Sequence, residues 1–156
     1  MPSSRNLLLA IAAVSLALIG AALYLQHAQG MLPCPLCVIQ RYFYLGIAIF
    51  SLIGAFANKI KAGAGLALLC ALGGLGYVAK HLYVLAHPGF SCGIDPMQTT
   101  LNKIPTATLL PGLFRADGLC EAAQETVLGL NVPQWSAVWF VILALALAWV
   151  LVRRAS

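Results

Sequence analysis

The sequence predicts an all-α integral membrane protein, an antiparallel bundle of four transmembrane helices. Of its 156 residues, 62% are hydrophobic and only 8% are charged, whereas about a quarter of the residues in a soluble domain are charged. This composition also excludes a disordered chain, which combines low hydrophobicity with high charge. In addition, four uncharged and mostly apolar stretches each have the length of a membrane span.

The four stretches cover residues 7–26, 42–58, 62–79 and 136–152. Each can cross a hydrocarbon layer of about 30 Å at a rise of about 1.5 Å per residue. Lipid cannot satisfy free backbone N–H and C=O groups, so each stretch is expected to be helical. The first stretch also has features of a signal peptide, but its apolar run exceeds the usual length of about 7–15 residues. We therefore expect residues 1–156 to form a single membrane domain.

The charged residues distinguish the two ends of the predicted bundle. One end carries five basic and no acidic residues, namely Arg5, Lys59, Lys61, Arg153 and Arg154. By the positive-inside rule, this end and both termini lie in the cytoplasm. The short loop 27–41 and the long loop 80–135, whose charges sum to zero, then face the periplasm. Because the basic residues form no dense run, nucleic-acid binding is not expected.

Four of the five cysteines lie in the two outer loops, namely Cys34, Cys37, Cys92 and Cys120, and only Cys70 lies in a predicted helix. Cysteines that serve only as small packing residues should fall mostly within the membrane, as Cys70 does. The distribution therefore favours thiol chemistry in an oxidising compartment, which for this topology is the bacterial periplasm.

Three interpretations of the Cys-Pro-Leu-Cys motif at 34–37 remain open: half of a metal site, a structural disulfide, or a redox-active dithiol. A zinc site usually needs a second CxxC or paired histidines. The histidines available as ligands are His27, His81 and His87. Four transmembrane helices do not need a structural disulfide to hold them together. These comparisons favour the redox-active dithiol.

The position of the motif supports this choice. If the second helix begins after Cys34, Pro35 occupies the first helical position, where proline is well tolerated. Both thiols then lie at the positive end of the helix dipole, which favours the reactive thiolate.

Arg41 lies four residues after Cys37 and so shares its helix face. A guanidinium at the membrane boundary is costly unless it is paired or functional. Arg41 either extends its charge toward lipid phosphates or stabilises a Cys37 thiolate or an anionic oxygen of a ligand.

The CxxC at 34–37 is followed by Arg41, by the outer-loop cysteines Cys92 and Cys120, and by Leu-Gly-Leu-Asn-Val-Pro-Gln-Trp at 128–135. This combination resembles the bacterial disulfide bond formation protein B (DsbB) family, quinone-dependent oxidases of periplasmic thiol oxidants. The resemblance extends from the first predicted helix to the last. A CxxC motif alone would be weak evidence for this resemblance, but the motif combined with this topology and spacing is specific to the family.

The resemblance implies an electron path through all four outer-loop cysteines in the bacterial inner membrane. A reduced DsbA-like partner of thioredoxin fold attacks Cys92 of a Cys92–Cys120 disulfide, and the released Cys120 attacks Cys34. Cys37 is thereby freed and passes two electrons to ubiquinone or menaquinone from the membrane pool. Arg41 and His81 are implied to lie with Cys37 at the quinone site, and no metal is implied. Relays of this kind keep the bacterial periplasm oxidising.

The main alternative is a small membrane protein that handles metal ions through Cys and His ligands. A thiol–quinone reductase of the vitamin K type is a weaker alternative, because its CxxC usually lies in a later helix. The composition between Cys92 and Cys120 differs from that of a well-known family member, which leaves open whether the partner is a general or a dedicated oxidant.

Overall fold

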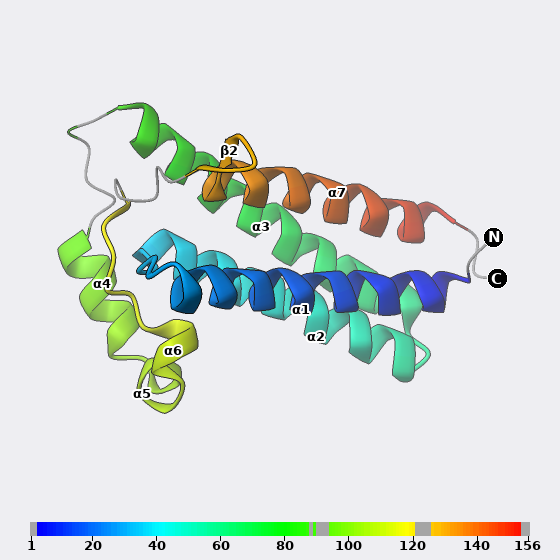
Figure 1. Cartoon of the computed structure of the whole chain (residues 1–156). Helices are drawn as coiled ribbons and strands as arrows, with labels where there is room; N and C mark the ends of the chain where they lie inside the picture. The colour runs from blue at the N-terminus through cyan, green and yellow to red at the C-terminus, as the bar shows by residue number, and fades with distance from the viewer. Residues whose placement is uncertain (1–2, 88, 90–93, 121–125, 154–156) are drawn as a thin grey trace.

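The computed structural model describes residues 3–87, 89, 94–120 and 126–153, with the side chains of residues 94 and 95 excepted. The chain has four long helices. They run side by side, and short elements gather at one end (Figure 1). The elements in chain order are α1 (Ser4–Ala28), α2 (Pro35–Phe56), α3 (Ile60–Ala86), α4 (Ile94–Asn102), α5 (Pro105–Leu109), α6 (Pro111–Phe114), β1 (Thr126–Val127), β2 (Leu130–Asn131) and α7 (Val132–Val152).

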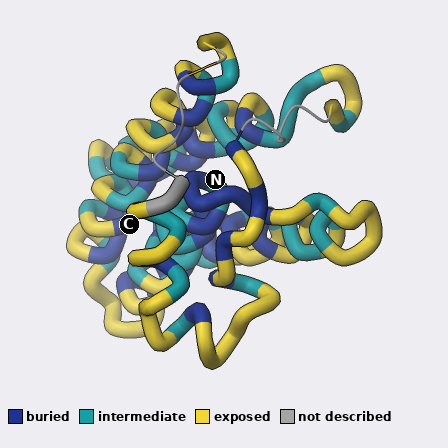
Figure 2. The backbone as a smooth tube through the Cα atoms, turned by 90° about the vertical axis from the view of Figure 1, so that its left-hand side faces the viewer, coloured by how far each residue is buried: buried dark blue, intermediate teal, exposed yellow. Residues whose placement is uncertain are grey.

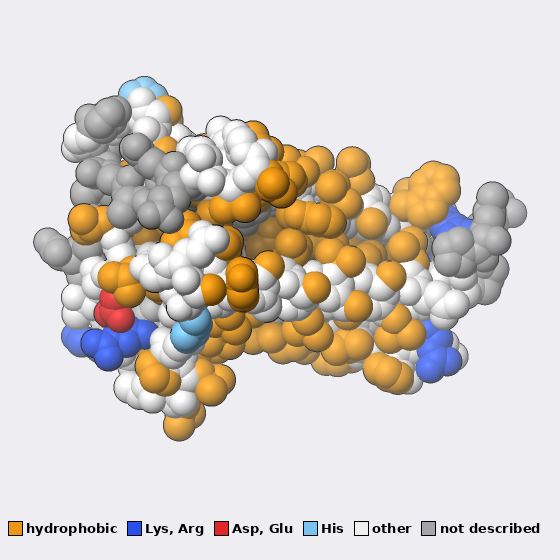
Figure 3. Space-filling view, in the orientation of Figure 1, with side chains coloured by type: hydrophobic (Ala, Val, Ile, Leu, Met, Phe, Trp, Pro, Cys, Tyr) orange, Lys and Arg blue, Asp and Glu red, His pale blue; other side chains and the backbone are white. Residues whose placement is uncertain are grey.

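The expected four-helix membrane bundle is confirmed. Helices α1, α2, α3 and α7 are each long and apolar enough to cross a membrane. They alternate in direction, with α2 packed against both α1 and α3, and α3 against α7. Apolar side chains cover the middle of the visible face, while the charged side chains lie toward its two ends (Figure 3). The chain is therefore a multi-pass membrane protein.

Two helices extend beyond the uncharged stretches of the sequence. Helix α2 begins at Pro35 instead of residue 42, and α3 continues to Ala86 instead of ending at residue 79. The uncharged stretches end where Arg41 and Lys80 introduce charge, but charge does not interrupt backbone hydrogen bonding. The CxxC motif consequently forms the start of a helix, with Cys34 as the N-cap residue.

The core of the bundle depends on small residues where helices meet. A Cβ atom on Gly63 of α3 would lie 2.5 Å from the Cα atom of Gly54 in α2. Tyr44 of α2 stacks on Phe140 of α7 with ring centroids 4.2 Å apart. The hydroxyl of Tyr44 also donates to the carbonyl oxygen of Ser136 at 3.1 Å. The buried parts of the helices face the inside of the bundle (Figure 2).

The short helices α4, α5 and α6 partly cover the outer end of α2. Leu101 and Phe114 are buried with Val38 of α2, and the Tyr42 ring stacks on Phe114 at 4.4 Å between centroids. Leu109, in contrast, is 77% exposed. The apolar residues of these short helices do not all share one environment. In the structure they divide between a small core of their own and an exposed apolar edge.

The motif at 128–135 forms the hairpin and the start of α7. Val127 pairs with Leu130 across a turn in which Leu128 and Gly129 both have positive φ angles, 53° and 87°. Two such residues are typical of a type I′ hairpin turn. The indole N–H of Trp135 donates to the Val127 carbonyl at 2.7 Å, which ties the hairpin to the helix.

The start of α1, the connection between α2 and α3, and the end of α7 lie at one end of the bundle (Figure 1). The CxxC motif and the short elements lie at the opposite end. This arrangement is the one that the charge distribution predicts, while the side of the membrane that each end faces stays a prediction.

Candidate active site

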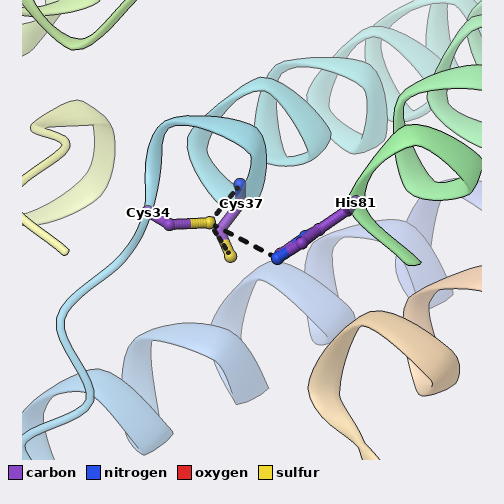
Figure 4. Close-up of side chains that lie close together, drawn as sticks. All are labelled: Cys34, Cys37 and His81. Atoms are coloured by element: carbon purple, nitrogen blue, oxygen red, sulfur yellow. Dashed lines mark hydrogen bonds between the residues drawn. The ribbon is translucent and has the colours of Figure 1, made fainter. Parts of the chain in front are cut away.

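The CxxC motif forms the N-terminus of α2. Cys34 is the N-cap residue, its sulfur accepts the Cys37 N–H at 3.2 Å, and Pro35 lies in the first turn. The sequence-based placement of these residues is thus confirmed. The two Sγ atoms lie 2.8 Å apart, which exceeds the S–S bond length of about 2.05 Å, so the pair is present as two thiols. Figure 4 shows both sulfurs with His81 of α3 beside them.

Cys34 lies in an enclosed position, with only 1% of its surface exposed. The hydrogen bond to Cys37, followed by burial, raises the pKa of the Cys34 thiol well above its ordinary value. Cys34 therefore keeps its proton at neutral pH and is the donor in the contact between the two sulfurs. Negative charge on this pair is accordingly expected on the Cys37 sulfur.

His81 is completely buried and connects α3 to the CxxC motif. Its Nε2 atom lies 3.8 Å from the Cys34 sulfur. On the other side of the ring, Nδ1 lies 3.4 Å from the amide nitrogen of Gln40, a residue of α2 that is itself buried. Gln40, His81 and Cys34 thus form a continuous polar chain in an otherwise apolar contact between α2 and α3.

Arg41 is buried beneath the loop helices, with 6% of its surface exposed. Its Nη1 donates to the carbonyl oxygen of Leu113 in α6 at 2.9 Å. The guanidinium also interacts electrostatically with both Cys37 and Cys34. Burial argues against the alternative that Arg41 only extends toward lipid phosphates, and the cation instead lies within the electrostatic reach of the thiols.

Cys120 belongs to the same buried corner. It shares a buried cluster with Cys34, Leu36 and Val84, and it is disulfide-bonded. Cys92, its expected partner, lies outside the described residues. The predicted roles of these two cysteines are therefore taken up below as proposals.

The chain just before Cys120 is attached to the short outer loop. The N–H groups of Asp117 and Gly118 both donate to the carbonyl oxygen of Pro33, at 3.1 and 3.0 Å. A Cβ atom on Gly118 would collide with the Leu32 carbonyl, so only glycine allows this close approach. The segment carrying Cys120 consequently lies directly against the residue that precedes Cys34.

The structure brings together most of the residues that the sequence singles out. Cys34, Cys37, Arg41, His81 and Cys120 meet at one end of the bundle. The remaining histidines lie apart: His27 and His87 are exposed, and each contacts a carbonyl of its own helix. Cys70 packs within the bundle close to Gly46.

Sequence reasoning missed Gln40. The available signal was a polar, uncharged residue within an apolar helix next to Arg41, and such residues need a buried partner. Only the tertiary structure shows that this partner is His81.

Three of these side chains also have the geometry of a partial metal site. One ligand atom each from Cys34, Cys37 and His81 lies within 4.8 Å of the others. In a tetrahedral zinc site with Zn–S bonds of about 2.3 Å, two sulfurs lie about 3.8 Å apart. The observed separation of 2.8 Å is shorter, so a metal ion would have to push the thiols apart.

The fold and the site together define a class: a helical membrane protein with a reactive dithiol at the mouth of its bundle and a disulfide-bonded cysteine beside it. Comparison with known proteins agrees with this description. The family described as "Disulfide bond formation protein DsbB" matches residues 4–150, and the chain belongs to this family.

Three relatives, each named Disulfide bond formation protein B, illustrate the similarity. The protein of Herminiimonas arsenicoxydans is 51% identical over 158 residues, covering all of both chains. Those of Cupriavidus necator and Cupriavidus metallidurans are 48% and 46% identical over 153 residues, covering 97% of this chain and 95% of theirs. The chain is accordingly a disulfide-forming oxidoreductase of the membrane.

Proposed function

We propose that the protein reoxidises a periplasmic, DsbA-like thiol oxidant of thioredoxin fold and passes the electrons to membrane ubiquinone or menaquinone. The observation that carries this proposal is the burial of Cys34 and Cys120 in one cluster beside Cys37. Two cysteine pairs that meet in this way can exchange disulfides, because exchange requires a thiolate to reach a disulfide sulfur. The protein would act in the bacterial inner membrane with both termini in the cytoplasm.

The first half of the reaction is thiol exchange. A thiolate of the reduced partner attacks Cys92 and forms a mixed disulfide with it, while the Cys92–Cys120 bond breaks and the electron pair remains on Cys120. Cys120 then attacks Cys34 of an oxidised Cys34–Cys37 pair. A Cys34–Cys120 bond forms, the Cys34–Cys37 bond breaks, and the electron pair goes to Cys37.

The second half depends on Cys37 and Arg41. Among the described residues, Arg41 has one hydrogen bond, to Leu113. A guanidinium carries five N–H donors, so further donors are available for a quinone oxygen. The positive charge also offsets the negative charge that collects on the Cys37 sulfur, which is preorganised electrostatic stabilisation. These features fit a quinone, which when bound supplies an acceptor for two electrons. His81 stays a predicted quinone neighbour.

The test is an anaerobic assay of the purified full-length protein in detergent, with a reduced thioredoxin-fold oxidant as donor and ubiquinone-1 as acceptor. We expect catalytic loss of quinone absorbance that Cys37→Ser and Cys92→Ser each abolish. Cys70→Ser is the matched control and should retain activity, because Cys70 lies away from the site. Full turnover by Cys37→Ser, or none by folded wild-type protein with titratable thiols, would contradict the proposal.

A second candidate function, metal handling, is favoured by the grouping of Cys34, Cys37 and His81. It predicts that the reduced protein retains stoichiometric zinc after purification and that His81→Ala releases it. Elemental analysis of the preparation measures the bound zinc. An oxidase, in contrast, must turn over in the presence of a chelator, and the two results together separate the functions.

A further inference from the structure

Gln40 and His81 are buried polar side chains whose contacts are not explained by quinone reduction. A buried polar group costs about 1–3 kcal/mol if it is left without a hydrogen bond. Here the two residues satisfy each other across the α2–α3 contact, with 3.4 Å between the Gln40 amide nitrogen and His81 Nδ1. This contact holds the His81 ring in one orientation against α2.

The contact with Gln40 determines which nitrogen of His81 carries the proton. An amide NH₂ group is a donor, so Nδ1 of the neutral ring must be the acceptor. The ring proton is thereby assigned to Nε2. This atom faces the Cys34 sulfur at 3.8 Å, as Figure 4 shows. Gln40 thus orients His81 so that it presents an N–H group to Cys34.

His81 also lies at the junction of the two cysteine pairs. Its ring lies close to the backbone of Cys120, and Cys120 is buried in the same cluster as Cys34. The hydrogen bonds from Asp117 and Gly118 to Pro33 hold the two segments together independently of the histidine. The ring is therefore within reach of the sulfur at which the exchange between the pairs takes place.

We propose that His81 is a catalytic residue for disulfide exchange between the two cysteine pairs, and that Gln40 is its positioning residue. This inference rests on the function proposed above. The step concerned is the return exchange. Once the partner's second thiolate has displaced Cys92 from the mixed disulfide, the Cys92 thiolate attacks Cys120 of the Cys34–Cys120 bond. The Cys92–Cys120 bond forms, the Cys34–Cys120 bond breaks, and the electron pair leaves on Cys34, to which His81 donates its N–H.

The physical reason is the burial of Cys34. A thiolate there has almost no access to water, since Cys34 is 1% exposed. Two N–H groups can replace water as donors, namely the backbone N–H of Cys37 at 3.2 Å and Nε2 of His81. A thiolate that is stabilised in this way is a better leaving group. Without His81, only one donor remains and the Cys34–Cys120 bond should break more slowly.

The experiment measures turnover and traps the disulfides formed during it. In the quinone assay, His81→Leu should lower kcat by about tenfold to hundredfold, less than the loss of about 10²–10³ for an oxyanion-hole donor. If His81 acts in the exchange step and not at the quinone, the KM for ubiquinone-1 should not change. Acid quenching and thiol blocking, followed by mass spectrometry, should show accumulation of the Cys34–Cys120 disulfide.

Conservative variants and a control separate this role from simple packing. His81→Gln retains an N–H donor and should recover part of kcat, whereas Gln40→Leu should reproduce the trapped disulfide without touching Cys34. His87→Leu is the control, at the residue that follows the last turn of the same helix, and because His87 is exposed it should behave as wild type. Thermal unfolding in detergent checks that each variant is folded.

The outcomes distinguish the possible failures. A raised KM for quinone without a trapped disulfide would overturn the inference and place His81 at the quinone site. Unchanged kcat in folded His81→Leu, or unchanged disulfides in Gln40→Leu, would also overturn it. Failure of the wild-type protein to reduce quinone would instead overturn the proposed function itself.

Discussion

Arg41 illustrates how a single residue combines a structural and a proposed chemical role. It is buried, it donates to the Leu113 carbonyl, and it interacts electrostatically with Cys37. Its position on the Cys37 face followed from helical spacing alone. Its contact with α6 could not be foreseen, because Leu113 is distant in sequence and is placed only by the packing of the loop.

Replacement of Arg41 by alanine should weaken the use of quinone. Because hydrogen bonds to charged groups contribute about 1.5–3 kcal/mol, we expect the KM for ubiquinone-1 to rise by about tenfold to hundredfold. Arg41→Lys should show an intermediate KM, since lysine keeps the charge but not the forked donor geometry. Arg115→Ala is the control, because Arg115 is exposed and pairs with Asp117. An unchanged KM in Arg41→Ala would remove Arg41 from the quinone site.

Cys34 shows the part of the site that local sequence controls. A proline at the first helical position and a capping side chain before it are local features, and both are found where the motif predicts them. Gln40 shows the opposite case. Its importance comes from His81, which lies 41 residues further along the chain, and no local pattern connects the two.

At the scale of elements, the contact between α2 and α3 depends on a glycine pair. Gly54 and Gly63 bring the two backbones so close that a Cβ atom on Gly63 would meet both Gly54 and the Phe50 carbonyl. Gly65 lies two residues after Gly63 in the same helix. A Cβ atom on Gly65 would have nothing within 4 Å. Substitution of Gly63 should therefore disturb the contact between α2 and α3, whereas substitution of Gly65 should not.

Gly63→Ala should destabilise the bundle by about 1–3 kcal/mol, the usual cost of overpacking a close contact. Gly65→Ala should instead be neutral or stabilising by up to about 1 kcal/mol, because alanine favours the helix. Equilibrium unfolding in mixed detergent, followed by circular dichroism, measures both. Equal stability of the two variants would show that the backbones can separate without loss.

The loop elements were the least predictable part of the fold. Residues 101–114 include several apolar side chains, but local sequence does not indicate that Leu101 and Phe114 pack on α2 while Leu109 stays exposed. Which apolar residues of a loop are covered depends on where its turns place them. The stacking of Tyr42 on Phe114 is a contact between elements far apart in sequence.

At the scale of the whole molecule, the charge distribution and the fold distinguish the same two ends of the bundle. The start of α1 and the end of α7 share one end with the α2–α3 connection, and the cysteines lie at the other. The five basic residues of the first end have no acidic neighbours in the sequence that would cancel their charge. By the positive-inside rule, we expect the cysteine end to face the periplasm.

Reporter fusions test this orientation. Alkaline phosphatase joined after Arg153 should be inactive, and a fluorescent protein joined there should fluoresce, because this end is expected in the cytoplasm. The same phosphatase inserted after Lys103, an exposed residue between α4 and α5, should be active. The reverse pattern would place the dithiol in the reducing cytoplasm and contradict the proposed oxidase.

The sequence by itself determined the helical membrane class, the number of long helices, the capped CxxC and the family to which the chain belongs. These depend on composition, on uncharged length and on local spacing, all of which act within short segments of the chain. Only the tertiary structure decided that His81 lies between Gln40 and Cys34, that the Cys120 segment is attached at Pro33, and that Arg41 is buried. These contacts join residues of different helices and loops, and they depend on how the packed elements are placed in space.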